Sequence, residues 1–213
     1  MKTEALIDLL ATGAGPVQDF PLARRFARAL ALGAAVTCAL FLALFRLNPA
    51  LADLGAAPDF WIKMMFTGAM AVAGLMATAR LARPGMTVGA VRWLAVAPLL
   101  AMWTLAAVTL VEAAPAVRAH LVLGSTWRVC ALNIAALSVP MLVAGVWALR
   151  GLAPTDLRLA GAALGLFAGA FAACLYGLHC PELAAPFLAV WYVIGMFIPS
   201  LLGWAVGPRL LRW

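Results

Sequence analysis

Cysteine and histidine are the side chains in this sequence best suited to chemistry. Cys180 directly follows His179, and Cys130 lies far earlier in the chain. A neighbouring imidazole can lower the pKa of a thiol or join it as a ligand to a soft metal. No CxxC spacing indicates a classical zinc site. The pattern therefore predicts thiol oxidation or soft-metal binding at Cys130, Cys180 and His179, whereas Cys38 and Cys174 fit the role of small apolar filler.

Catalytic motifs of soluble enzymes are missing from the sequence. It contains neither a phosphate-binding Gly-Lys-Ser/Thr loop nor a His-Glu-x-x-His pair. Glu112, His120 and Ser125 share one polar segment, which is ordinary for a loop that faces water. We therefore expect a protein that is not an enzyme and needs no cofactor.

The N-terminal segment has the pattern of a short amphipathic helix. Thr3 can cap it, Glu4 suits its first turn, and Gly13 ends it. Such a helix is marginal alone in water, so its apolar stripe should dock on a partner's groove, on the rest of the protein or on lipid. Lipid is the least attractive choice because the segment is acidic. The candidate partner-binding residues are Leu6, Ile7, Asp8, Leu9 and Leu10.

Composition requires the remaining elements to lie in a membrane. Of the 213 residues, 66% are hydrophobic and 11% are charged, a surplus of apolar side chains that a soluble core of this size could not bury. We expect an all-α membrane protein with a bundle of six transmembrane helices. The apolar blocks are Ala29–Leu47, Trp61–Ala79, Trp93–Val111, Cys130–Leu149, Leu159–Tyr176 and Phe187–Val206.

The basic residues predict the orientation of this bundle. Eleven of the 15 lysines and arginines fall on the side of the two termini: Lys2, Arg24, Arg25, Arg28, Arg80, Arg83, Arg92, Arg150, Arg158, Arg209 and Arg212. The other side has Arg46, Lys63, Arg118 and Arg128. The positive-inside rule therefore places both termini in the cytoplasm. The basic residues that produce the net charge of +7 lie between the apolar blocks rather than along one stripe with interleaved aromatic side chains, so no direct binding of nucleic acid is expected.

This topology divides the chain into a cytoplasmic segment (1–28), a transmembrane bundle (29–206) and a short cytoplasmic tail (207–213). It also places Cys130 and Cys180 at the same outer depth. Outside a bacterial inner membrane two accessible thiols tend to pair. A permanent disulfide and a reversible redox or metal switch both remain open.

Within the blocks, ionisable residues avoid the centres. Lys63 lies near the outer end of the second block, where its side chain can snorkel to water. Pumps and proton-coupled carriers place charge at depth, so these classes are disfavoured. Gly161, Gly165 and Gly169 share one face of the fifth block and predict close helix packing, preferably within the same chain.

Several motifs resemble a known family. They are Thr-x-x-Leu-Ile-x-x-Leu-Ala from Thr3 to Ala11, Pro16-Val17, Pro-Leu-x-Arg-Arg from Pro21 to Arg25, Trp127-Arg-x-Cys130, and Tyr176-x-Leu-His-Cys-Pro181. The chain resembles the NrsF-like bacterial anti-sigma factors, which are six-helix inner-membrane proteins that hold an extracytoplasmic-function sigma factor. The likeness covers almost the whole chain, with Leu-His-Cys-Pro its most specific part.

The resemblance implies a function for the features above. The N-terminal residues 6–10 would bind the sigma factor, and Cys130 and Cys180 would sense an outer signal. The alternative is a small channel or carrier for an uncharged or soft-metal solute, which would need a polar stripe on several helices. A structural subunit of a larger membrane complex is a third possibility. The oligomeric state and the inducing signal stay open.

Overall fold

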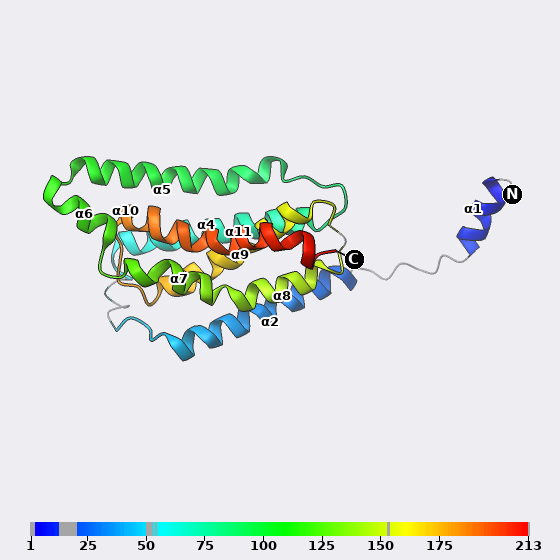
Figure 1. Cartoon of the computed structure of the whole chain (residues 1–213), viewed down its shortest axis with the longest axis horizontal. Helices are drawn as coiled ribbons and strands as arrows, with labels where there is room; N and C mark the ends of the chain where they lie inside the picture. The colour runs from blue at the N-terminus through cyan, green and yellow to red at the C-terminus, as the bar shows by residue number, and fades with distance from the viewer. Residues whose placement is uncertain (1–2, 13–20, 50–52, 54, 153, 213) are drawn as a thin grey trace.

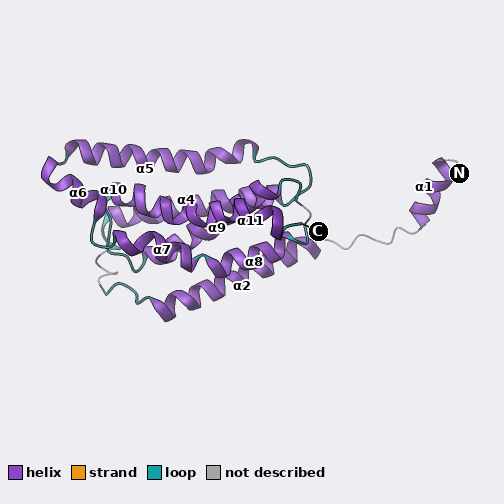
Figure 2. Ribbon diagram, viewed as in Figure 1, coloured by secondary structure: helices purple, strands orange, loops and turns teal. Residues whose placement is uncertain are grey.

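All regular structure in the described residues is helical. The computed structural model describes the chain except for residues 1–2, 13–20, 50–52, 54, 153 and 213 (Figure 1). The elements are α1 (Thr3–Thr12), α2 (Pro21–Leu44), α4 (Pro58–Leu81), η1 (Gly89–Val91), α5 (Arg92–Glu112), α6 (Pro115–Leu123), α7 (Trp127–Leu137), α8 (Val139–Leu149), α9 (Leu157–Gly177), α10 (Ala185–Phe187), η2 (Leu188–Tyr192) and α11 (Val193–Leu210). Figure 2 shows these helices joined by loops.

Within the described residues, six helical stretches are long and apolar enough to cross a membrane. They are α2, α4, η1 with α5, α6 to α8, α9, and α10 to α11. The expected all-α class with six apolar helices is confirmed. α2 begins at Pro21, about two helical turns before Ala29, where the first apolar block was expected to begin. α11 likewise extends to Leu210, beyond the expected end of the sixth block.

Helix α9 lies at the centre of the bundle. In the most apolar part of α9, 67% of the residues are buried, compared with 11% in the most apolar part of the helical stretch formed by η1 and α5. Figure 1 shows α5 along one side of the bundle and α2 along the opposite side. A helix surrounded by others needs small side chains where backbones approach each other. α9 supplies them, since most of its buried residues are alanine or glycine.

The glycines of α9 set its contact with α11. A Cβ atom at Gly165 would overlap the carbonyl group of Pro199, and one at Gly169 would lie 2.7 Å from the Met196 carbonyl oxygen. Gly161 meets Gly203 in the same way, backbone against backbone. The three glycines therefore allow two helices of one chain to approach more closely than any larger residue would permit.

A proline divides the fourth apolar block. α7 ends at Leu137 and α8 begins at Val139, with Pro140 in the first turn of α8. Proline has no N–H to donate to the preceding turn. The Ser138 hydroxyl donates to the Ala135 carbonyl at 2.6 Å, which satisfies one acceptor at the break. The sequence predicted one helix here, and the structure has two consecutive ones.

One end of the bundle carries Cys130 and Cys180, and we call it the cysteine end. It comprises residues 45–49, 53, 55–57, 113–126 and 178–184, together with the first turn of α7. The expected loop before Cys130 contains the additional helix α6. Its Val122 carbonyl accepts the Trp191 indole N–H at 2.9 Å, which fixes α6 against η2.

Candidate functional site: a buried thiol pair

Two helix termini bring the thiols of the cysteine end together. Cys130 lies in the first turn of α7, and Cys180 follows the end of α9. The Cys180 backbone N–H donates to the Tyr176 carbonyl at 2.9 Å, which closes the last turn of α9 and directs the loop inward. Both residues are buried, with 0% and 1% of their surfaces exposed. The expectation of accessible thiols was therefore wrong, because the loops of the cysteine end cover them.

The two cysteines are free thiols in contact with each other. The neighbouring Cys130 thiol is the main influence that lowers the pKa of the Cys180 thiol from its ordinary value, and this effect outweighs burial, which acts in the opposite direction. The Glu182 backbone N–H and the side chains of Tyr192 and Thr126 lower this pKa further. Cys180 is thus the member of the pair whose surroundings favour the ionised form.

Lys63 is part of the same cluster. Its side chain is 0% exposed, and its Nζ donates to the carbonyl oxygens of Cys180 at 2.9 Å and Glu182 at 3.3 Å. The expectation that Lys63 snorkels to water is therefore wrong. Snorkelling would save the cost of burying an ammonium group, but here the loop after α9 folds over α4 and supplies acceptors.

Glu182 joins this loop to the segment before α7. Its carboxylate accepts the backbone N–H of Ser125 at 2.7 Å and the Ser125 hydroxyl at 2.6 Å. Gly124 has a φ of +54°, and a Cβ there would lie 2.7 Å from the Glu182 carboxyl carbon. Only glycine combines that backbone conformation with so close a carboxylate.

His179 turns away from the thiols. Its Nδ1 lies 2.6 Å from the Arg46 carbonyl oxygen, and its ring packs against those of Phe45 and Tyr176. In the described part of the chain, no group of three or more His, Cys, Asp or Glu side chains could hold a metal ion. His179 therefore anchors the loop after α9 to the loop after α2.

Tyr192 and Tyr176 complete the cluster from η2 and α9. Tyr192 is 0% exposed, and its hydroxyl makes no hydrogen bond of ordinary geometry within the described residues. The Tyr176 hydroxyl accepts from the Asn133 amide at 3.4 Å. Lys63 and Tyr192 were not among the sequence candidates. A lone lysine inside an apolar block was a usable signal for Lys63, because such charges are rare without a function.

The predicted N-terminal helix is present as α1. Leu6 and Ile7 are 42% and 58% exposed, and Asp8 is also exposed. The side chains of Leu9 and Leu10 lie outside the described residues. Figure 1 shows α1 well apart from the bundle. Two apolar side chains of the candidate binding stripe thus face solvent.

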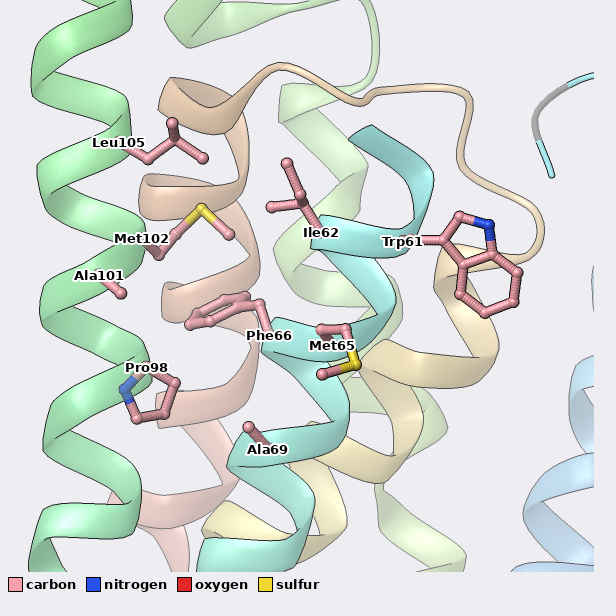
Figure 3. Close-up of a pocket in the computed structure, with 9 residues that line it drawn as sticks. All are labelled: Trp61, Ile62, Met65, Phe66, Ala69, Pro98, Ala101, Met102 and Leu105. Carbon is pink, nitrogen blue, oxygen red and sulfur yellow. The ribbon is translucent and has the colours of Figure 1, made fainter. Parts of the chain in front are cut away.

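A groove between α4 and α5 opens on the side of the bundle (Figure 3). Its volume is about 440 Å³. The Trp61 indole N–H, its one polar side-chain group, donates to the Gly55 carbonyl at 2.9 Å. Such a lining offers no ligand for an ion or a polar solute. The lining residues are Trp61, Ile62, Met65, Phe66, Ala69, Pro98, Ala101, Met102 and Leu105.

The described residues thus define a class of protein: an all-helical fold with six apolar helices of membrane-spanning length and a buried thiol pair at one end. The chain belongs to the NrsF family. The family model described as "Negative regulator of sigma F" matches residues 10–213. No solved structure matches the chain.

Two curated relatives cover the whole chain and are themselves covered completely. The chain is 48% identical over 216 residues to the "Probable anti-sigma-F factor NrsF" of Azospira oryzae. It is 41% identical over 215 residues to the "Anti-sigma-F factor NrsF" of Caulobacter vibrioides. The family resemblance seen in the sequence motifs is therefore confirmed.

Proposed function

We propose that this protein is a membrane-bound anti-sigma factor that sequesters an extracytoplasmic-function sigma factor. The observation that carries the proposal is the full-length similarity to two proteins named anti-sigma-F factors. The protein has no catalytic role in this scheme. Its partners are the sigma factor and the lipid bilayer, and it does not contact nucleic acid directly.

In this proposal α1 is the sigma-binding element. Leu6 and Ile7 are exposed on a helix of ten residues, a length that is marginal in water without a partner. Burying each apolar side chain in a groove of the sigma factor contributes about 1.5–3 kcal/mol. Leu9 and Leu10 extend the same apolar segment, and Asp8 adds a polar contact at its edge.

The thiol pair is the proposed sensor. Cys130 and Cys180 lie beside each other in one buried cluster, so a small movement brings the sulfurs to bonding distance, about 2.05 Å. A hydroperoxide would oxidise the pair: the two thiols lose two electrons and two protons, and the peroxide is reduced to an alcohol and water. We favour oxidation over metal binding because the His179 Nδ1 is engaged with the Arg46 carbonyl.

The helices suggest how such a signal could reach α1. Cys130 belongs to α7, which continues into α8, and α8 packs against α2. A Cβ atom at Gly33 of α2 would lie 2.9 Å from the Ala144 Cβ of α8, so movement of α8 is transmitted to α2. Residues 13–20 connect α2 to α1 along the chain. A change at the thiols must favour one arrangement of these helices for the coupling to work.

The cation distribution supports an N-in, C-in placement in a bacterial inner membrane, with the cysteine end outside. The rival channel or carrier reading has less support, because the groove between α4 and α5 is apolar.

Affinity purification of the tagged full-length protein from its own membranes tests the proposal directly. Mass spectrometry of the eluate should identify a sigma subunit of RNA polymerase, and treatment of the membranes with hydroperoxide should reduce its yield. An eluate without any sigma subunit would refute the anti-sigma function.

A further inference from the structure

The buried ammonium group of Lys63 has no carboxylate as its direct partner. Its Nζ binds two main-chain carbonyl oxygens, and the Glu182 carboxylate is bonded to Ser125 instead. An ammonium group without a counterion is costly to bury. The ionisable groups with which its charge interacts favourably are first Cys180, then Cys130 and Glu182. A thiolate in this cluster would therefore be stabilised by the Lys63 ammonium group.

Hydrogen-bond donors converge on the Cys180 sulfur. The Thr126 hydroxyl lies 3.8 Å from it, and the Cys130 thiol and the Glu182 backbone N–H are placed where they favour its ionised form. The Tyr192 hydroxyl is fully buried, lacks another partner in the described chain and lies close enough to turn its proton toward a sulfur anion. A neutral thiol is a weak acceptor, whereas an anion satisfies several donors at once.

We propose that Cys180 carries the thiolate of the pair, and that Lys63 and Tyr192 are the positioning residues that stabilise it. The inference deepens the thiol sensor described above and rests on it. It assigns an order to the two cysteines: Cys180 attacks the oxidant, and Cys130 completes the disulfide.

The steps balance with a hydroperoxide as the oxidant. The Cys180 thiolate attacks the terminal peroxide oxygen, the O–O bond breaks, and the alkoxide leaves and takes a proton to become an alcohol. Cys180 is then a sulfenic acid. The Cys130 sulfur attacks the Cys180 sulfur, the S–O bond breaks, and the hydroxide leaves with the thiol proton as water.

The surroundings of Cys180 limit what else could control its ionisation. The titratable and charged groups that face it are Lys63 from α4, Cys130 from α7, Tyr176 from α9, Tyr192 from η2 and Glu182 from its own loop. Lys63 is the one cation in this set. Its removal is therefore the most direct test.

The experiment is a pH titration of the full-length protein in lipid nanodiscs, with 13C at Cβ of cysteine and NMR detection. The Cβ shift reports thiol ionisation without any labelling reagent, and Cys-to-Ser variants assign the signals. Lys63→Gln should raise the pKa of Cys180 by about one unit or more, since an opposite charge is lost while an amide can still donate to the carbonyls. Tyr192→Phe should raise it less.

Two further variants separate charge from structure. Lys63→Met removes both the charge and the carbonyl hydrogen bonds, whereas Arg128→Gln removes an exposed cation of α7 and should leave the titration unchanged. If Lys63→Gln titrates as the parent does and only Lys63→Met differs, Lys63 merely holds the loop and the proposal fails. It also fails if Cys130 ionises before Cys180. Should Lys63→Gln not fold, Lys63→Arg must keep the parent's Cys180 pKa.

This titration requires no sigma factor, so it is independent of the proposed sensing. Loss of oxidant-triggered release in Cys180→Ser tests the sensor itself. If hydroperoxide still releases the sigma factor but Lys63→Gln leaves the pKa of Cys180 unchanged, only the role of Lys63 is overturned.

Discussion

At the scale of single residues, the cluster at the cysteine end depends on partners that are distant in sequence. Lys63 donates to Cys180 and Glu182, and Ser125 donates to that same Glu182. Each of these bonds joins loops or helices that enclose the thiols. The thiols therefore lie in an enclosed, buried environment rather than in an exposed loop.

Replacing either thiol should abolish the response to oxidant. In Cys130→Ser and Cys180→Ser no disulfide can form, so hydroperoxide should no longer release the sigma factor from purified complex. Cys174→Ser, which changes a partly buried thiol within α9, is the matched control and should respond as the parent does. Release measured by pull-down before and after peroxide provides the readout. Persistent release from both variants would show that the signal acts elsewhere.

At the scale of the helix, α1 offers a defined surface. Leu6→Asp with Ile7→Asp places two charges on the exposed apolar stripe, so affinity for the sigma factor should fall about a hundredfold or more, the equivalent of roughly 3 kcal/mol. Surface-immobilised sigma factor and the full-length protein in nanodiscs provide the measurement.

Ala5→Asp is the control for this change. Ala5 is also exposed on α1, but in a helix of 3.6 residues per turn it lies about 100° around the axis from Leu6 and about 160° from Ile7. It should bind nearly as the parent does. Equal loss of affinity in the control and the double variant would mean that charge on α1, not its stripe, governs binding.

The contact of α9 with α11 makes a separate prediction. Gly165→Ala places a methyl group against the Pro199 carbonyl, so the helices must separate, and the free energy of unfolding should fall by about 1–3 kcal/mol. Gly68→Ala in α4 is the matched control, because nothing lies within 4 Å of a Cβ there. Thermal unfolding followed by circular dichroism compares the two. A Gly165→Ala variant as stable as Gly68→Ala would mean that α11 shifts at little cost.

The existence of the helices was predictable from sequence, whereas several local details were not. Blocks of apolar residues gave the six long helices because length and hydrophobicity suffice for that inference. α6 was missed because its nine residues are too few to cross a membrane and include Arg118 and His120, so the segment was assigned to a loop between two apolar blocks. The burial of Lys63 depends on a loop that follows 117 residues later, and no local pattern reports it. His179 was expected beside the thiols from its position in sequence, but its ring is held by Arg46 and Phe45.

At the scale of the whole molecule, the arrangement makes the two ends of the bundle different. Arg25, Arg92 and Arg158 each lie over a tryptophan ring at the end opposite to the cysteines, whereas at the cysteine end Arg128 lies over Trp127. Arginine and tryptophan are both suited to a membrane–water boundary. This supports the proposed orientation, in which that end faces the cytoplasm.

Topology reporters test this orientation. An enzyme active only outside the cytoplasmic membrane should be silent when fused at either terminus and active when inserted near Asp53, Arg118 or Glu182. A second reporter, active only inside, should give the reverse pattern. Outside activity at a terminus would contradict the orientation and place the thiols in a reducing compartment.

The bonds of Lys63 also have a consequence for biogenesis. Their acceptors lie 117 and 119 residues further along the chain. A ribosome therefore delivers α4 with its charge long before the loop that accepts it exists, and the last hairpin, α9 to α11, completes the fold. Chains truncated after α8 would retain an uncompensated ammonium group in an incomplete bundle, a feature by which quality-control proteases could distinguish unfinished copies from finished ones.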